Sequence, residues 1–145
     1  KIVVMPDKFY HYVMESESAT HEFNSAEARA KKLDAHMRML EEVLEDWAAY
    51  DLLDLCPGEL ITWFLDLIVF DLARLDADGF HHVAARVNMG LTTFLGTEWA
   101  DMPAKGAVRR VAHKLVAATS GVSMADATLF YLSTRGLKAC LERFI

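Results

Sequence analysis

Residues 26–47, AEARAKKLDAHMRMLEEVLEDW, contain the pattern that decides the fold class of this chain. Apolar side chains recur there at alternating steps of four and three residues. That spacing places them on one stripe of an α-helix, close to a heptad repeat. The opposite face carries lysine, arginine and glutamate, as a solvated face does. The stripe consists of Ala26, Ala30, Leu33, Met37, Leu40, Leu44 and Trp47.

The boundaries expected for this helix come from capping and helix-breaking residues. Asn24 followed by Glu27 predicts a capping box, in which each side chain satisfies a free backbone N–H at the helix start. The helix is expected to stop near Cys56, because Pro57 and Gly58 cannot continue it cheaply. We therefore expect one long helix between these two signals.

Three helical segments follow the first one. Residues 59–75 are apolar nearly all round, so this helix must be buried on most sides. Residues 80–95 carry one apolar face and end before a glycine. A fourth helix is expected to start at Asp101-Met102-Pro103, because aspartate suits the positive end of the helix dipole and proline suits the first turn.

A fifth helix is predicted to begin at Ser123, with Asp126 three residues on, and Gly136 is a candidate break within it. Five helices joined by short turns indicate an all-α fold, either a bundle or an orthogonal array. We expect two parts, a short irregular or strand-like N-terminal arm over residues 1–23 and a helical domain over residues 24–145.

Composition limits the class of protein. The chain has 145 residues, a net charge of −6 and 53% hydrophobic residues, which fits one domain with a dense core or with an apolar surface covered by a partner subunit. Its two cysteines, Cys56 and Cys140, lack metal-ligand or redox spacing. No signal peptide or bilayer-spanning run is recognisable. We expect a soluble, cytoplasmic protein without membrane contact.

Residues that could carry chemistry are scattered along the sequence. Glu17 and His21 have the i, i+4 spacing of helical metal ligands, but they lie in the expected N-terminal arm, and no such pair repeats across the helices. The run 76–79 resembles the start of a calcium loop, but Val87 stands where such a loop needs glutamate. Phosphate-binding glycine loops and nucleophile elbows are absent from the sequence. We expect no enzyme activity, no metal and no cofactor. The histidines are His11, His21, His36, His81, His82 and His113.

Two aspartates interrupt the most apolar helix. Asp66 and Asp71 are five residues apart and do not share a helix face, so they are not expected to form a catalytic pair. A buried carboxylate without a partner is costly. We therefore expect each to lie at a rim or to pair with an arginine across a subunit interface.

Residues 117–123, AATSGVS, resemble the turn of a helix-turn-helix unit. Small residues would let two helices touch, Gly121 would form the turn, and Ser123 would cap the second helix. The following residues 124–131 are apolar and acidic, whereas a recognition helix needs side chains that read bases and bind phosphates. The pattern is therefore consistent with both a DNA-binding helix-turn-helix unit and a plain helical hairpin.

The dense basic cluster of the chain lies on the fourth helix. It consists of Lys105, Arg109, Arg110 and Lys114. Such a cluster either contacts a phosphate backbone without reading its sequence or simply solvates the outer side of the helix. These four residues are the candidate nucleic-acid contacts of the sequence.

Residues 72–80, LARLDADGF, and the alanine-containing helix after them resemble a segment of small terminase subunits of tailed bacteriophages. In one group of these proteins, an apolar helix ends in an Arg-Leu-Asp-x-Gly-Asp turn. Here the glycine and the second aspartate are exchanged, and Ala73 replaces the tryptophan before the arginine. The resemblance implies a ring-forming, non-catalytic subunit that recognises viral DNA in the host cytoplasm and delivers it to a packaging motor.

Three functions are consistent with these features. The first is a homo-oligomeric helical assembly protein of viral type, with Leu33, Met37, Leu40, Leu44 and Trp47 as its oligomer or packing seam. The second is a helical adaptor or regulator that binds another protein and no nucleic acid. The third is a helix-turn-helix protein that binds double-stranded DNA. We place the assembly protein first, because so high an apolar fraction favours a subunit interface.

Overall fold

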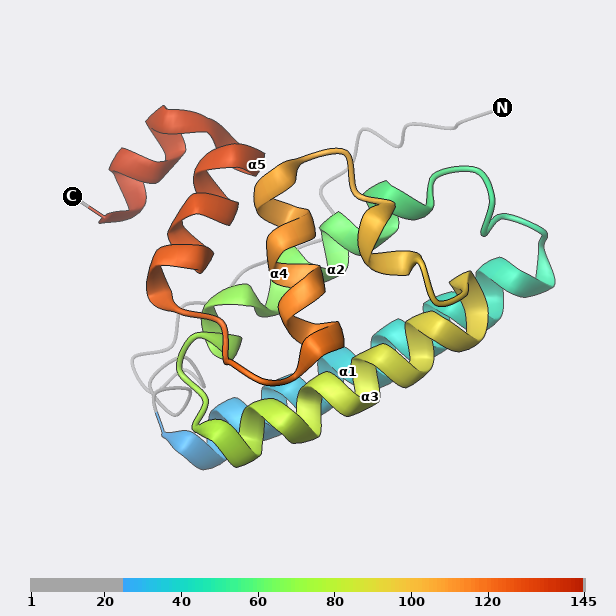
Figure 1. The fold of residues 1–145 in the computed structure, drawn as a ribbon, viewed down its shortest axis with the longest axis horizontal. Coiled ribbons are helices and arrows are strands. Elements are labelled where there is room, and N and C mark those ends of the chain that lie inside the picture. The colour runs from blue at the N-terminus through green and yellow to red at the C-terminus, as the bar shows by residue number, and fades with distance from the viewer. Residues whose placement is uncertain (1–24, 145) are drawn as a thin grey trace, which may run out of the picture.

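The computed structural model describes residues 25–144 of the chain, and the expected arm of residues 1–23 lies outside them. Within the described range the fold is all-α, with five α-helices, one short 3₁₀ helix and no strand, as predicted (Figure 1). The elements are α1 (Ala26–Ala49), α2 (Pro57–Leu72), α3 (Ala77–Leu95), η2 (Trp99–Asp101), α4 (Gly106–Ala117) and α5 (Met124–Phe144).

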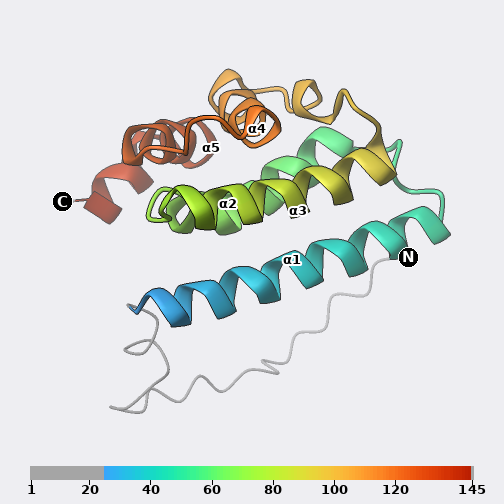
Figure 2. The same ribbon diagram turned by 60° about the horizontal axis from the view of Figure 1, so that its bottom comes forward.

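The first three helices form the base of the molecule. α1 and α3 run side by side in the same direction, and α2 returns in the opposite direction (Figures 1 and 2). Arg86 of α3 joins this pair electrostatically, because its guanidinium binds Asp34 at 2.6 Å and Glu41 at 2.8 Å, both on α1. A polar residue of α3 therefore crosslinks two helices.

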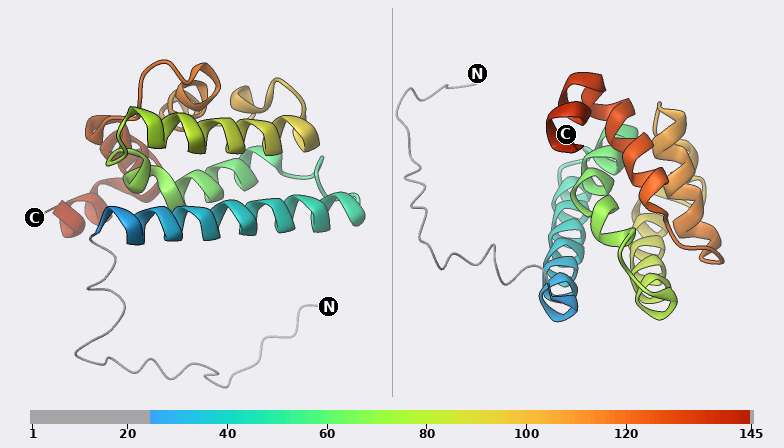
Figure 3. Two further views of the ribbon diagram at one scale, coloured as in Figure 1. Left: turned by 90° about the horizontal axis from the view of Figure 1, so that it is seen from below. Right: turned by 90° about the vertical axis from the view of Figure 1, so that its left-hand side faces the viewer.

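α4 and α5 cover the other side of α2 and run across α1 and α3 rather than along them (Figures 1 and 3). This crossing makes the fold an orthogonal array rather than a simple bundle. α5 bends at Gly136, whose φ of 84° and ψ of 170° are not helical. A positive φ of this kind is accessible to glycine at little cost, so the predicted break at this position is confirmed.

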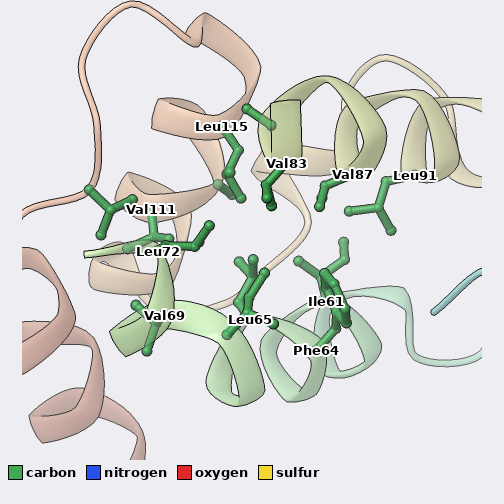
Figure 4. Close-up of a cluster of buried hydrophobic side chains, with 14 of the residues drawn as sticks. Ile61, Phe64, Leu65, Val69, Leu72, Val83, Val87, Leu91, Val111 and Leu115 are labelled. Atoms are coloured by element: carbon green, nitrogen blue, oxygen red, sulfur yellow. The ribbon is translucent and has the colours of Figure 1, made fainter. Parts of the chain in front are cut away.

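The core is built around α2. Side chains of α2, α3 and α4 point toward one another in its centre (Figure 4). Nine of the sixteen residues of α2 are buried, as expected for a helix that is apolar nearly all round. The labelled core residues are Ile61, Phe64, Leu65, Val69, Leu72, Val83, Val87, Leu91, Val111 and Leu115.

The ends of α1 differ from the prediction. Its N-cap is Ser25, whose side chain accepts a hydrogen bond from the backbone N–H of Ala28, and not Asn24. The helix ends at Ala49 and not near Cys56. Asp51 adopts a left-handed conformation with φ of 55°, which a helix cannot continue through.

The pair that was expected to stop α1 instead starts α2. Pro57 occupies the first turn of α2, where its missing N–H costs nothing. Gly58 is required by packing, because a Cβ built on it would lie 2.5 Å from the carbonyl oxygen of Met102. The start of α2 is thus pressed against the backbone that precedes α4.

The start of α4 was also misplaced by the sequence pattern. Helix α4 begins at Gly106, and the Asp101-Met102-Pro103 stretch belongs to the 3₁₀ turn of η2 and the loop after it. This turn buries Trp99, whose indole N–H donates to Asn88 Oδ1 at 2.9 Å. The burial of the Trp99 indole dictates this turn, and local capping preferences do not reveal that burial.

No helix in residues 25–144 has the length and apolar character needed to cross a bilayer.

Candidate functional site

The stripe predicted on α1 is a packing seam inside the chain. Leu33, Met37, Leu40 and Leu44 are all buried, and Trp47 is half-buried against the same core. Helices α2 and α3 of the same chain cover these side chains. The packing part of the prediction is therefore correct. Leu33, Met37, Leu40 and Leu44 are too buried to offer a surface to a second copy in this fold.

The basic cluster on α4 is used for contacts within the chain. The ammonium group of Lys105 donates to the backbone oxygen of Ser133 on α5. The guanidinium of Arg109 donates to the carbonyl oxygens of Pro103 and Ala104, both at 3.0 Å, in the loop before its own helix. Both side chains therefore hold backbone oxygens that would otherwise need other donors.

The other two cations of the cluster meet at one buried carboxylate. Arg110 Nε lies 3.0 Å from Asp126 Oδ1, and Lys114 Nζ lies 2.6 Å from Asp126 Oδ2. Asp126 is only 3% exposed. Burial by itself raises the pKa of Asp126, but hydrogen bonds from Lys114 and Ser123 outweigh it, so this pKa lies well below its ordinary value.

Asp126 also completes the predicted cap of α5. Ser123 donates to Asp126 Oδ2 from its backbone N–H at 2.8 Å and from its hydroxyl at 2.6 Å, and Asp126 N–H donates back to Ser123 Oγ at 3.1 Å. This reciprocal pair is a capping box. We call Arg110, Lys114, Ser123 and Asp126 the Asp126 node. The node links α4 to α5. Two of the four predicted nucleic-acid contacts, Arg110 and Lys114, therefore pair with a carboxylate of the chain itself.

The expected helix-turn-helix turn joins α4 to α5, but its conformation differs from the prediction. The left-handed residue of the turn is Ala118, with φ of 51°, and not Gly121. In the following helix, Ala127 and Phe130 are buried in the core. The turn therefore builds a helical hairpin whose second helix is anchored through its own first turns.

The segment that resembles small terminase subunits forms the turn between α2 and α3. Asp76 is the N-cap of α3 and accepts a hydrogen bond from the backbone N–H of Gly79 at 2.8 Å. A Cβ at Gly79 would lie 3.0 Å from Asp76 Oδ1, so a small residue suits this turn. Capping and close approach thus account for the aspartate and glycine of this segment.

Asp66 and Asp71 pair within the chain rather than across a subunit interface. Asp71 is 5% exposed and binds Lys32 of α1 at 2.7 Å, with Arg74 at 4.0 Å. Asp66 binds Arg135 of α5. The prediction that arginine partners Asp66 is correct in residue type, but the arginine comes from a helix 69 residues further along the same chain.

These pairs line a polar cleft of about 490 Å³ where α1, α2 and both parts of α5 meet. We call it the Asp71 cleft. Four cationic side chains and two carboxylates line it, together with His36 and the aromatic side chains of Phe70 and Tyr131. The charged members are Lys32, Arg74, Arg135, Arg143, Asp66 and Asp71.

Three groups in the Asp71 cleft have unused hydrogen-bonding or charge capacity. Arg143 stacks on Phe70, 4.3 Å from the ring centre, and pairs with no carboxylate among residues 25–144. Within the same range, His36 Nδ1 and Asp66 Oδ1 are buried atoms without a hydrogen-bond partner. Burial is the main cause that lowers the pKa of His36, and it favours the neutral imidazole.

A second surface feature lies on α5 after the bend. Leu137 is 64% exposed, and Leu141 and Phe144 are each 47% exposed. Their steps of four and three residues place them on one helical stripe, which we call the α5 stripe. Sequence reasoning missed this stripe, although its spacing is the same signal that identified the stripe of α1.

The residues of the Asp71 cleft had no local signal in the sequence. They come from three helices and the turn after α2, and they share no motif. Among the residues that the structure describes, no three histidine, cysteine, aspartate or glutamate side chains are grouped to hold a metal. Comparisons with protein-family models, curated proteins and solved structures find no match to this chain.

Proposed function

We propose that this chain is a non-catalytic helical assembly protein that associates with a second copy of itself through the α5 stripe. The observation that carries the proposal is the exposure of Leu137, Leu141 and Phe144 on one face. Single exposed apolar residues are ordinary on a protein surface, but a contiguous apolar patch favours an interaction site.

The charges beside the α5 stripe are self-complementary. Lys138 and Glu142 lie on the same flank of the stripe, one turn apart, and both are largely exposed. In an antiparallel pair related by a two-fold axis, the same flanks face each other with reversed direction. An axis near Cys140 then brings Lys138 level with the partner's Glu142, and Leu137 level with the partner's Phe144.

The expected dimer is of modest strength. One short helix from each copy buries less than the roughly 1,200 Å² of a standard interface. Mass should therefore rise with protein concentration rather than stay constant. The proposed interface is therefore the α5 stripe, whereas the sequence pattern had suggested the α1 stripe.

The test is the native mass by light scattering across a concentration series, for the wild type and for Leu141→Asp. The wild type should shift toward a dimer, and the variant should stay monomeric, because dimerisation would bury a charge without a partner. Leu129→Asp is the matched control, since Leu129 is 49% exposed on α5 before the bend. A monomeric wild type at all concentrations, or a Leu141→Asp variant with wild-type mass, contradicts the proposal.

Disulfide trapping locates the interface. Cys140 is half-buried and lies halfway along the α5 stripe on the flank opposite Lys138, so the proposed axis places two copies of Cys140 near each other at the edge of the interface. In a Cys56→Ser background, mild oxidation should produce a covalent dimer at Cys140. Adding Leu141→Asp should abolish this crosslink.

The narrower proposal is that this assembly is a DNA-packaging subunit of the small terminase type. Its support is the sequence of the α2–α3 turn, whose aspartate and glycine also serve that turn's own geometry. Binding of double-stranded DNA that weakens steeply with salt would support it. Dimerisation without any DNA binding would leave the assembly function and remove the packaging role.

A further inference from the structure

We propose that the Asp71 cleft binds a small phosphate monoester that carries hydroxyl groups. The assignment goes beyond self-association, and it depends on side chains other than the α5 stripe. It rests on three properties of the cleft: its excess of positive charge, its unpartnered buried polar atoms and its size.

The charge of the cleft favours a dianion. Four cationic side chains face two carboxylates there, although the chain as a whole has a net charge of −6. Lys32 and Arg135 are engaged by Asp71 and Asp66. Arg74 lies 4.0 Å from Asp71, and Arg143 has no carboxylate partner in residues 25–144, so both guanidinium groups retain donors for an anion. A phosphate monoester carries a charge of about −1.5 to −2 at pH 7.

The buried atoms of the cleft favour hydroxyl groups on the same ligand. Asp66 Oδ1 is a buried acceptor without a donor among residues 25–144, and His36 Nδ1 is a second unpartnered polar atom. Such groups are costly in a folded protein, and a ligand hydroxyl that donates to Asp66 removes this cost. An anion without hydroxyl groups would leave Asp66 Oδ1 without a hydrogen-bond donor and would bring a second negative charge close to this carboxylate.

The shape of the cleft suits a molecule of this class. Its volume of about 490 Å³ lies in the range of small-ligand pockets. Arg143 is oriented by stacking on Phe70 and Tyr131, 4.3 and 5.0 Å from the two ring centres. A guanidinium held in this way loses less side-chain freedom when it binds phosphate.

The experiment is isothermal titration calorimetry of the full chain with glycerol 3-phosphate and with inorganic phosphate, at constant ionic strength. Both should bind, and glycerol 3-phosphate should bind more tightly because it supplies hydroxyl donors. Arg74→Gln should weaken binding at least about tenfold, since it removes charge-assisted hydrogen bonds. This variant should fold, because Lys32 still pairs with Asp71.

Arg38→Gln is the matched control. Arg38 lies on the face of α1 opposite Lys32 and His36, and it pairs with Asp34 outside the cleft. It should bind glycerol 3-phosphate as the wild type does. Absence of binding by the wild type, or equal weakening by Arg74→Gln and Arg38→Gln, overturns the proposal. The proposal is also overturned if the chain binds a short DNA duplex through Arg74 and does not bind glycerol 3-phosphate. That result would favour a nucleic-acid backbone as the ligand.

Discussion

The two apolar stripes of this chain have nearly the same spacing and opposite surroundings. On α1, Leu33, Met37, Leu40 and Leu44 are covered by other helices of the chain. On α5, the stripe that starts at Leu137 stays exposed after the bend at Gly136. The comparison teaches that helical periodicity identifies an apolar face and does not identify what covers it.

The bend explains why the second stripe is left uncovered. Before Gly136, α5 packs on α2 and α4 and buries Phe130. After Gly136, the helix changes direction (Figure 3). Arg143 contacts Phe70 there, and Phe144, at the edge of the α5 stripe, packs partly against Phe70 while 47% of it stays exposed. The non-helical backbone of Gly136 therefore turns the end of α5, with Leu137 and Leu141, away from the line of its first part.

The largest expected effect is on the α1 stripe. Leu44→Asp should destabilise the fold by about 4 kcal/mol or more, because it places a carboxylate without a partner at a fully buried position and leaves a cavity. Thermal unfolding followed by circular dichroism measures this loss. A variant with the wild-type melting temperature would mean that Leu44 is not in the core.

A smaller effect is expected at the Asp126 node, which anchors the part of α5 before the bend. Asp126→Asn should cost about 2–4 kcal/mol, because it weakens a cap and leaves Lys114 without its carboxylate. Since the folded pKa of Asp126 is depressed, this stability is present above the unfolded pKa and is lost as pH falls through the folded pKa.

Chemical denaturation at several pH values measures this linkage. The difference between the wild type and Asp126→Asn should be largest above about pH 5 and should shrink toward acid. The variant should remain acid-sensitive, because hydrogen bonds from Arg86 also lower the pKa values of Asp34 and Glu41. A difference that is independent of pH would exclude a charged Asp126 as the source.

The smallest effect on stability is expected on the α5 stripe. Leu137→Ser should change the free energy of unfolding of the monomer by no more than about 0.5 kcal/mol, because Leu137 is 64% exposed. Denaturation at low protein concentration measures this value. A loss as large as that of a core leucine would mean that the monomer itself covers the stripe, and the contrast with α1 would disappear.

Much of the fold was predictable because its signals are local. Apolar patterns and helix-start signals identified the five helices, and the Ser123–Asp126 cap and the break at Gly136 were read from neighbouring residues. Predicted ends were less accurate where a distant contact decided them. The backbone at Met102 approaches Gly58 too closely for a side chain, and no local preference contains that information.

The candidate sites were much less predictable than the helices. The sequence singled out Lys105, Arg109, Arg110 and Lys114 as a basic cluster, but it did not reveal that Asp126 and three backbone oxygens occupy them. Arg135 and Arg143 lie far from Asp66 and Asp71 in the chain, so the Asp71 cleft had no motif to reveal it.

The helical segments could be identified from local sequence, because backbone hydrogen bonding and side-chain period act over a few residues. Helix packing determines which stripe is covered, which charges are neutralised and where a polar cleft forms. These properties depend on contacts between residues that are tens of positions apart, such as Asp66 with Arg135. Their pairing is set by how whole helices pack and not by the residues beside them.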